Sequence, residues 1–229
     1  MKKEFVHLEW GVVKIALNSR ARRIIMRARE DGIYVTAPPM ATMSDVERAL
    51  DRYGEKLRQL QVSTRRVIAA GYKIGDGGFR IELQEYTGTK FMWVHNGMTA
   101  TLMCPENIDY QEKQDWLRKV IVNAITDYAK KVLPPRLAAL AGKHNLKYTC
   151  CSVRNSHTRW GSCSGKGNIS LSIYLVLLPD ELIDYVLLHE LCHTLEMNHS
   201  ERFWARLDVL CGGDSKKIRR KLKNHIPGI

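Results

Sequence analysis

The sequence predicts an α+β fold in which a β-rich N-terminal domain, residues 1–105, precedes a mixed core, residues 106–229. Short runs of β-branched and aromatic residues, separated by turn signals, fill the first hundred positions. From Asp109 onward apolar residues recur at helical spacing. Short strand patterns then lead into a further helix, so the second half combines a small sheet with helices.

The N-terminal domain is expected to hold two β regions around one helix. Residues 6–17 alternate loosely, and residues 24–36 read as a hairpin around Asp31-Gly32, a favoured two-residue turn. Ser44 and Glu47 form a capping-box pattern, so a helix is expected from there to about residue 60. A second β region is expected from residue 79 to 103. No internal repeat is visible.

The C-terminal core is expected to begin with a helix over residues 109–132, which Pro134-Pro135 should break before a shorter helix through Ala141. A β stretch over residues 147–159, a glycine- and serine-rich turn over 160–167 and a strand over 168–177 should follow. Pro179 suits a first helical turn, and its helix should run to about Met197. Ser200 should then cap a new helix through Glu201, Phe203, Trp204, Leu207 and Leu210.

The amino-acid composition limits the classes of protein to which the chain can belong. Apolar residues make up 45% of the chain and charged residues 26%, as in ordinary folded domains. No signal-peptide core and no apolar run of about 18 residues is visible, so we expect a cytoplasmic protein with no membrane partner. The six cysteines form no C-x-x-C pair, which indicates reduced thiols.

The strongest functional signal is His189-Glu190-x-x-His193. Residues four apart on a helix present their side chains to one side, so the two imidazoles can bind one zinc ion. Glu190 lies about 100° around the helix from His189, where a carboxylate can take a proton from zinc-bound water. His199, ten residues after His189, is the candidate third ligand, with Glu196 and Glu201 as rivals.

A series of motifs in the last 80 residues resembles the YgjP-like metallopeptidase family. They are Arg159-Trp160-Gly161-Ser162-Cys163-Ser164, the strand from Asn168, the segment from Pro179 to Val186, the histidine motif, and Asn198-His199-Ser200 through Phe203-Trp204. The β-rich part before a minimal zincin-like core, with a small sheet and an HExxH active-site helix, is also similar to that family. The sequence departs from the family pattern at His157, where a lysine is expected.

The resemblance implies a zinc-dependent hydrolase related to the small DNA-associated zinc proteases of the SprT and WLM type. It implies one Zn²⁺ per chain with His189, His193 and His199 as ligands and Glu190 as the catalytic base. The expected reaction is therefore peptide hydrolysis by metal-activated water, with a peptide or unfolded protein as substrate. An edge strand, within residues 147–159 or 168–177, is expected to pair with extended substrate.

Other residues are weaker candidates. Four side chains are candidates to donate a hydrogen bond to the charge that develops in the transition state: Arg154, His157, Arg159 and Tyr185. The alternative interpretation is that they are solvated strand positions or a core hydroxyl. Trp160 and Trp204 are interpreted as core aromatics. The net charge of +12 is concentrated outside residues 147–214, and the strongest basic cluster is a candidate nucleic-acid surface or the solvated face of a docked helix: Lys216, Lys217, Arg219, Arg220, Lys221 and Lys223.

Two alternative functions remain open at this point. One is metal-dependent hydrolysis of a phosphoanhydride such as a nucleotide, against which the lack of a phosphate-binding glycine-rich loop counts. The other is a nucleic-acid-associated protein with a structural zinc site, against which Glu190 and a set of only three protein ligands count.

Overall fold

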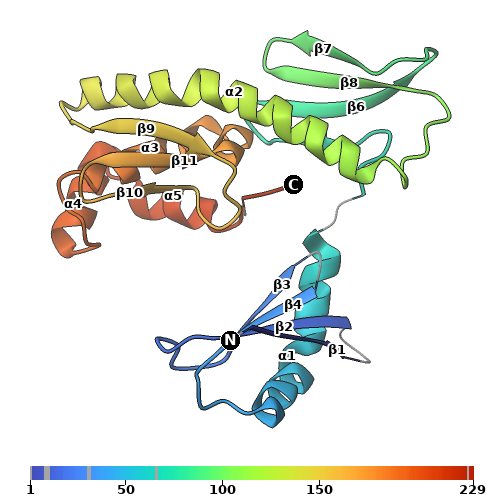
Figure 1. The fold of residues 1–229 in the computed structure, drawn as a ribbon. Helices are drawn as coiled ribbons and strands as arrows, with labels where there is room; N and C mark the ends of the chain where they lie inside the picture. The colour runs from blue at the N-terminus through green and yellow to red at the C-terminus, as the bar shows by residue number, and fades with distance from the viewer. Residues whose placement is uncertain (1, 8–10, 30–31, 65–66, 226) are drawn as a thin grey trace. The chain divides into compact units, whose positions relative to one another are not determined.

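The computed structural model describes residues 2–7, 11–29, 32–64, 67–225 and 227–229 and has the predicted α+β fold (Figure 1). The chain forms two compact units, residues 1–66 and residues 67–229. The second unit contains all the histidines and candidate catalytic groups discussed below. No helix among the described residues is long and apolar enough to cross a membrane. All six cysteines are free thiols.

The first unit is a four-stranded sheet with one helix, α1 (Met43–Thr64). Val13, Ile15, Ile33 and Val35 of the sheet form a small core with Val46 and Leu50 of α1. Its strands lie in the order β1-β2-β4-β3: β1 (Lys2–His7), β2 (Gly11–Leu17), β3 (Ile25–Arg29) and β4 (Gly32–Ala37).

Two local predictions in this unit can be compared with the structure. The expected hairpin is confirmed, since β3 and β4 pair antiparallel, while Asp31 of its turn lies outside the described residues. The helix cap lies earlier than predicted. The amide of Asp45 donates to Thr42 Oγ1 at 3.2 Å, and the amide of Thr42 donates to the Asp45 carboxylate at 2.8 Å. Thr42 and Asp45 therefore form the reciprocal cap, rather than Ser44 and Glu47.

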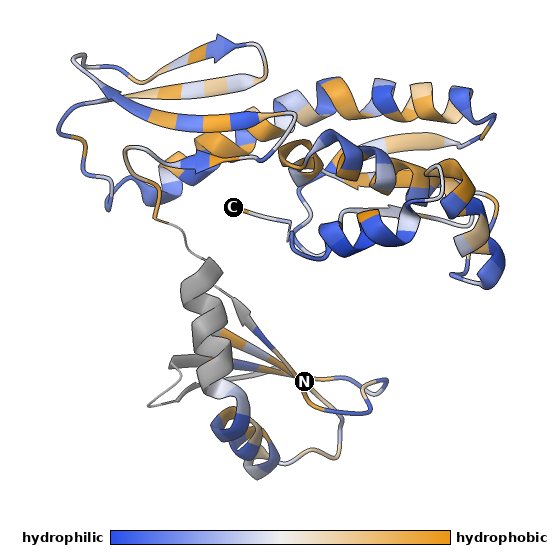
Figure 2. Cartoon of the chain, turned by 180° about the vertical axis from the view of Figure 1, so that it is seen from behind, coloured by the Kyte–Doolittle hydropathy of each residue, from blue (hydrophilic) through white to orange (hydrophobic). Residues whose placement is uncertain are grey.

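The second unit opens with another four-stranded sheet, whose strands alternate between hydrophobic and hydrophilic residues (Figure 2). Its order β5-β6-β8-β7 repeats the order of the first sheet, and the parallel pair β6 and β8 corresponds to β2 and β4. A helix follows each sheet, so the fold contains a topological repeat that the sequence did not reveal. The strands are β5 (Lys73–Ile74), β6 (Arg80–Tyr86), β7 (Met92–Asn96) and β8 (Thr99–Pro105).

Helix α2 (Gln114–Lys143) is continuous, and the predicted break at Pro134-Pro135 is wrong. A proline removes one helical hydrogen bond, but tertiary packing overrides this cost when the buried face continues beyond it. Here that face does continue, because buried residues recur every four positions along the helix: Leu117, Ile121, Ile125, Ala129, Leu133, Leu137 and Ala141.

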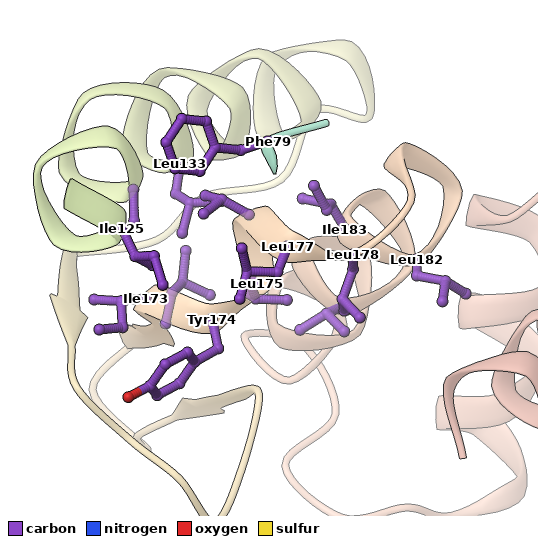
Figure 3. Close-up of a cluster of buried hydrophobic side chains, with 14 of the residues drawn as sticks. Phe79, Ile125, Leu133, Ile173, Tyr174, Leu175, Leu177, Leu178, Leu182 and Ile183 are labelled. Carbon is purple, nitrogen blue, oxygen red and sulfur yellow. The ribbon is translucent and has the colours of Figure 1, made fainter. Parts of the chain in front are cut away.

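The boundary predicted near residue 105 falls inside the second unit. Phe79, which precedes β6, stacks on Tyr128 of α2 with ring centroids 4.0 Å apart. Phe79 also lies beside Leu133 in the buried cluster shown in Figure 3. The second sheet and α2 thus share one hydrophobic core, and the chain changes from strands to helix within this unit.

A third sheet follows α2 and leads to the histidine helix. Its order is β10-β11-β9, with β11 antiparallel to β10 and parallel to β9. The predicted strand over residues 168–177 stops at Ser172, because the next five residues form a buried 3₁₀ helix, η1 (Ile173–Leu177). The strands are β9 (Cys150–Arg154), β10 (Gly161–Cys163) and β11 (Asn168–Ser172).

Three helices complete the unit: α3 (Asp180–Cys192), α4 (Glu201–Leu210) and α5 (Ser215–Leu222). Arg136 of α2 holds the beginning of α3, since its guanidinium donates to Asp184 at 2.6 Å and to Asp180 at 2.5 Å. The residues of η1 and α3 are largely apolar and buried. Helix α3 is consequently fixed in the core before it reaches its first histidine.

Candidate metal centre

Three imidazoles converge where α3 ends. His189 lies in the last turn of α3, His193 is its C-terminal cap residue, and His199 lies in the loop before α4. One ligand nitrogen from each ring lies within 4.8 Å of those of the other two. The Nε2 atoms of His189 and His199 are 3.1 Å apart, so they either share a proton or direct their lone pairs to one cation.

The end of α3 brings His199 back to the other rings. The helix ends at Cys192, earlier than the predicted end at Met197, and His193 caps it. The Nδ1 atom of His193 lies 3.0 Å from the carbonyl oxygen of Glu196, and this contact closes the turn after the helix. A carbonyl can only accept, so Nδ1 carries the proton and Nε2 remains a ligand. Ser200 Oγ then accepts from the amide of Phe203 and starts α4, as predicted.

The rival carboxylates lie apart from the group of three rings. Glu196 contributes its backbone carbonyl to His193, while its side chain pairs with Arg206 at 3.5 Å. Glu201 is exposed in the first turn of α4. Within the described part of the chain, the metal-ligating side chains that converge here are the three histidines.

Phe203 packs against all three imidazoles. Its side chain is fully buried, and its ring centroid lies 4.9, 4.5 and 4.7 Å from those of His189, His193 and His199. An aromatic ring in van der Waals contact restricts the rotation of each imidazole, and ligands that are already oriented bind a metal with less loss of entropy. Sequence reasoning placed Phe203 in a helix and a family motif but assigned it no part in the site.

Glu190 is buried beside the histidines, with 5% of its surface exposed. Its Oε2 atom has no hydrogen-bond partner among the described residues. Burial raises the pKa of Glu190 from 4.5 to about 7, against the opposing charge of Arg159. A buried carboxyl with a pKa near neutrality can gain and lose a proton under working conditions, as a general base must.

Gly161 of β10 makes room for this carboxyl. A Cβ atom at position 161 would lie 2.7 Å from both Cγ and Oε1 of Glu190, closer than side chains pack. The residues from Trp160 to Gly167 were predicted as a turn, but Gly161–Cys163 pair with β11 and pack against α3. Because a three-residue strand containing glycine has little strand propensity of its own, only the packing against β11 and α3 reveals it.

The three rings form a donor set that fits zinc. Burial, followed by the charges of His193, His199 and Arg219, lowers the pKa of His189 to about 3. Burial also lowers the pKa of His199. Neutral imidazoles with free nitrogens are the form that ligates a metal, and three nitrogen ligands with an adjacent unpartnered carboxylate oxygen are typical of a catalytic zinc site.

The metal-free protein offers a test of the buried carboxyl. In the folded state Glu190 keeps its proton up to about pH 7, whereas the unfolded chain releases it near pH 4.5. Glu190 therefore lowers stability progressively as pH rises from about 4.5 to 7. Glu190→Gln removes this loss, so its free energy of unfolding should exceed that of the wild type by an amount that grows over this range, by roughly 3 kcal/mol.

Denaturant unfolding of both proteins at several pH values, in the presence of a chelator, measures this difference. Glu112→Gln is the matched control, because Glu112 is exposed before α2 and should show no such growth. A stability difference between Glu190→Gln and wild type that does not change with pH would mean that Glu190 titrates normally.

The four candidates for transition-state charge lie in different surroundings. Arg159 acts electrostatically on Glu190, and the Tyr185 ring lies 6.2 Å from that of His189. Burial raises the pKa of Tyr185 to about 12, so its hydroxyl keeps its proton and can donate. His157 instead meets the Tyr174 hydroxyl at 3.1 Å, and Arg154 is exposed at the end of β9. Arg159 and Tyr185 are thus the two that the fold brings to this centre.

Helix α5 carries the basic cluster on its outer face and docks through Ile218, which is buried between α3 and α4. Lys221 pairs with Glu181 of α3 at 2.5 Å. Arg219 lies over the ring of Trp204, beside the histidines. Three exposed lysines and one exposed arginine form no ion pair within the described residues: Lys216, Lys217, Arg220 and Lys223.

Comparison with known proteins gives one family match. The model of the YgjP-like family, described as a metallopeptidase domain, matches residues 22–225. No curated protein matches the chain. A crystal structure of the metallopeptidase zymogen of Pyrococcus abyssi abylysin is 23% identical over 41% of this chain and 94% of that chain, with a TM-score of 0.36. A likeness of that size carries no argument about function.

Proposed function

Because the chain belongs to the YgjP-like metallopeptidase family, we propose that it hydrolyses peptide bonds with one zinc ion held by His189, His193 and His199. The observation that carries this proposal is the convergence of the three ring nitrogens next to a buried, unpartnered carboxylate oxygen of Glu190. A metallopeptidase needs this combination of ligands and base.

A zinc ion held by His189, His193 and His199 would lower the pKa of water and polarise a carbonyl. Within the chain, Glu190 Oε2 accepts the proton of the attacking water, since it has no other partner, and later gives it to the leaving amine. Phe203 and the contact of His193 with Glu196 hold the rings in place. Tyr185 supplies a neutral hydroxyl as the donor for charge on the substrate oxygen.

The substrate backbone is expected to pair with β10. The strand from residue 168 was a candidate for this role, but β11 lies between β9 and β10 and has both edges occupied. Trp160 and Ser164 bond to β11, so the amides and carbonyls of Gly161 and Cys163 point away from it. These groups form a short open edge within the described residues, next to Glu190, and an extended peptide can add to it.

Glu190→Gln tests the proposal directly. We expect a loss of turnover of at least about 100-fold, because the general base is removed, with zinc content unchanged. Zinc is measured in the purified protein, and turnover is screened on unfolded proteins and on nucleoside triphosphates. Glu112→Gln serves as the matched control. Peptide cleavage that persists in Glu190→Gln, or wild-type protein that does not bind zinc, would reject the proposal. Nucleotide turnover alone would favour a phosphoanhydride hydrolase.

We also propose nucleic acid as a partner of the exposed basic face of α5, through Lys216, Lys217, Arg220 and Lys223. A patch of unpaired positive charge attracts phosphate groups without sequence preference. DNA binding measured at low and moderate salt tests this partner, and the same turnover screen run with and without DNA shows whether binding changes activity. Binding that is independent of salt, or equal binding by a variant with all four residues changed to glutamine, would argue against it.

A further inference from the structure

Arg219 has a defined place beside the metal centre. Its guanidinium carbon lies 4.4 Å from the centroid of the Trp204 ring. The Trp204 ring in turn stacks on His199, with centroids 5.4 Å apart and an interplanar angle of 23°. Helix α5 is fixed against α4, since Ile218 is buried and Ser215 Oγ donates to Asp208 at 2.5 Å. The arginine is therefore held next to the histidines by its own helix.

Within the described part of the chain, the N–H groups of Arg219 have no hydrogen-bond partner. Arg219 forms no ion pair or hydrogen bond with any described residue, whereas two nearby cations have carboxylate partners, Lys221 with Glu181 and Arg206 with Glu196. The Trp204 ring covers one face of the guanidinium and leaves the donors in its plane available. A planar set of free N–H donors matches the geometry of a carboxylate.

The charge of Arg219 acts on the site itself. Its guanidinium lies over the Trp204 ring, which stacks on the ligand His199. A fixed positive charge disfavours a bound metal cation, so Arg219 does not serve metal binding. Arg159 adds a second positive charge on the side of Glu190. A site flanked by two cationic groups attracts an anionic group of its substrate.

We propose that Arg219 binds a carboxylate of the peptide substrate close to the bond that is cleaved. The proposal rests on the proposed peptidase function. The Trp204 ring contacts both the guanidinium and His199, which places Arg219 beside the metal ligands rather than among them. A carboxylate one or two residues away fits, because an extended chain advances about 3.3 Å per residue. The group is either an Asp or Glu side chain or the C-terminal carboxylate of the substrate.

Paired peptides test this specificity with the zinc-loaded full-length protein. One set places Glu or Gln at each position around the cleaved bond, and a second compares a free with an amidated C-terminus. We expect wild type to prefer the carboxylate by about 10- to 100-fold in kcat/KM, as a charge-assisted hydrogen-bonded pair allows. Arg219→Gln should reduce this ratio to near one, and Arg219→Glu should favour Lys at the same position.

Arg202→Gln is the matched control. Arg202 is exposed on α4 two residues before Trp204, and among the described residues the cation over that ring is Arg219. This variant should keep the preference of wild type. If the preference appears between Glu and Gln peptides, the bound carboxylate is a side chain of the substrate. If it appears between the free and the amidated C-terminus, the bound group is the C-terminal carboxylate. The proposal would be overturned if Arg219→Gln lowered kcat/KM equally for Glu and Gln peptides, or if Arg202→Gln removed the preference for Glu as well.

A binding measurement separates this proposal from the proposed function. The Glu190→Gln protein should hold peptides without cleaving them, so fluorescence anisotropy can compare a Glu peptide with its Gln partner. We expect a preference of about tenfold in Kd that the additional Arg219→Gln change removes. If wild type cleaves no peptide, the peptidase function fails, while the anisotropy result still decides the role of Arg219. Equal Kd values for the two peptides would refute that role.

Discussion

Replacing Gly161 with alanine should lower kcat by about 100-fold or more while zinc content stays the same. The new methyl group would lie 2.7 Å from Glu190 Cγ and Oε1, so the carboxyl must move by about 1 Å to reach normal contact. A displacement of this size at a catalytic group costs on the order of 100-fold in rate. Steady-state kinetics on a peptide substrate, together with metal analysis, measures the effect. KM should change less than kcat, because the substrate edge of β10 remains.

Gly165→Ala is the matched control for this prediction. Gly165 lies in the turn that follows β10, and a Cβ atom there would meet nothing within 4 Å. This variant should keep wild-type kinetics. A double change adds a stricter test: in the Gly161→Ala background, Glu190→Gln should cost much less than it does in wild type, because the base is already misplaced. Additive losses would show that Gly161 does not act through Glu190.

Replacing Phe203 with alanine should have the largest effect on stability. Phe203 is fully buried, and truncation of a buried phenylalanine costs about 3–5 kcal/mol in the free energy of unfolding. It also removes the surface on which three imidazoles rest, so zinc affinity should fall as well. Denaturant unfolding of the metal-free protein and competition with a zinc chelator measure the two losses separately.

Leu207→Ala is the control that distinguishes the effect of a buried cavity from the effect of removing the ring that supports the metal ligands. Leu207 is also fully buried, one turn further along α4, and its loss should cost a similar 2–5 kcal/mol. It makes no ring contact with the histidines, so zinc affinity should change little. Equal losses of zinc affinity in Phe203→Ala and Leu207→Ala would mean that Phe203 acts only through general stability.

The sequence alone predicted those parts of the site that depend on local geometry. The four-residue spacing of His189 and His193 places them together on almost any helix, and Ser200 is a strong start signal for α4. The position of His199 could not be predicted from spacing alone, because its side chain comes back to the other two histidines only if α3 ends where it does. That end is set by a contact between His193 and a backbone carbonyl, which propensity does not encode.

Contacts between distant segments account for what the sequence did not show. Nothing in the pattern around Gly161 indicates that a helix residue 29 positions later occupies the space of its missing side chain. In the sequence Arg219 is one of several cations in a basic segment, and its position over Trp204 depends on the packing of α5 against α4. The continuity of α2 through Pro134 similarly depends on a buried face formed by the sheets.

The order of these segments along the chain has a consequence for synthesis on the ribosome. The first unit forms its contacts within residues 1–66 and can fold as soon as it has emerged. The metal centre, in contrast, requires β10, α3, α4 and α5, which follow one another from residue 161 to residue 222. While the N-terminal unit and the second sheet are being made, the metal centre has not yet been assembled, and hydrolysis by the chain can begin only after α5 has been made and has folded.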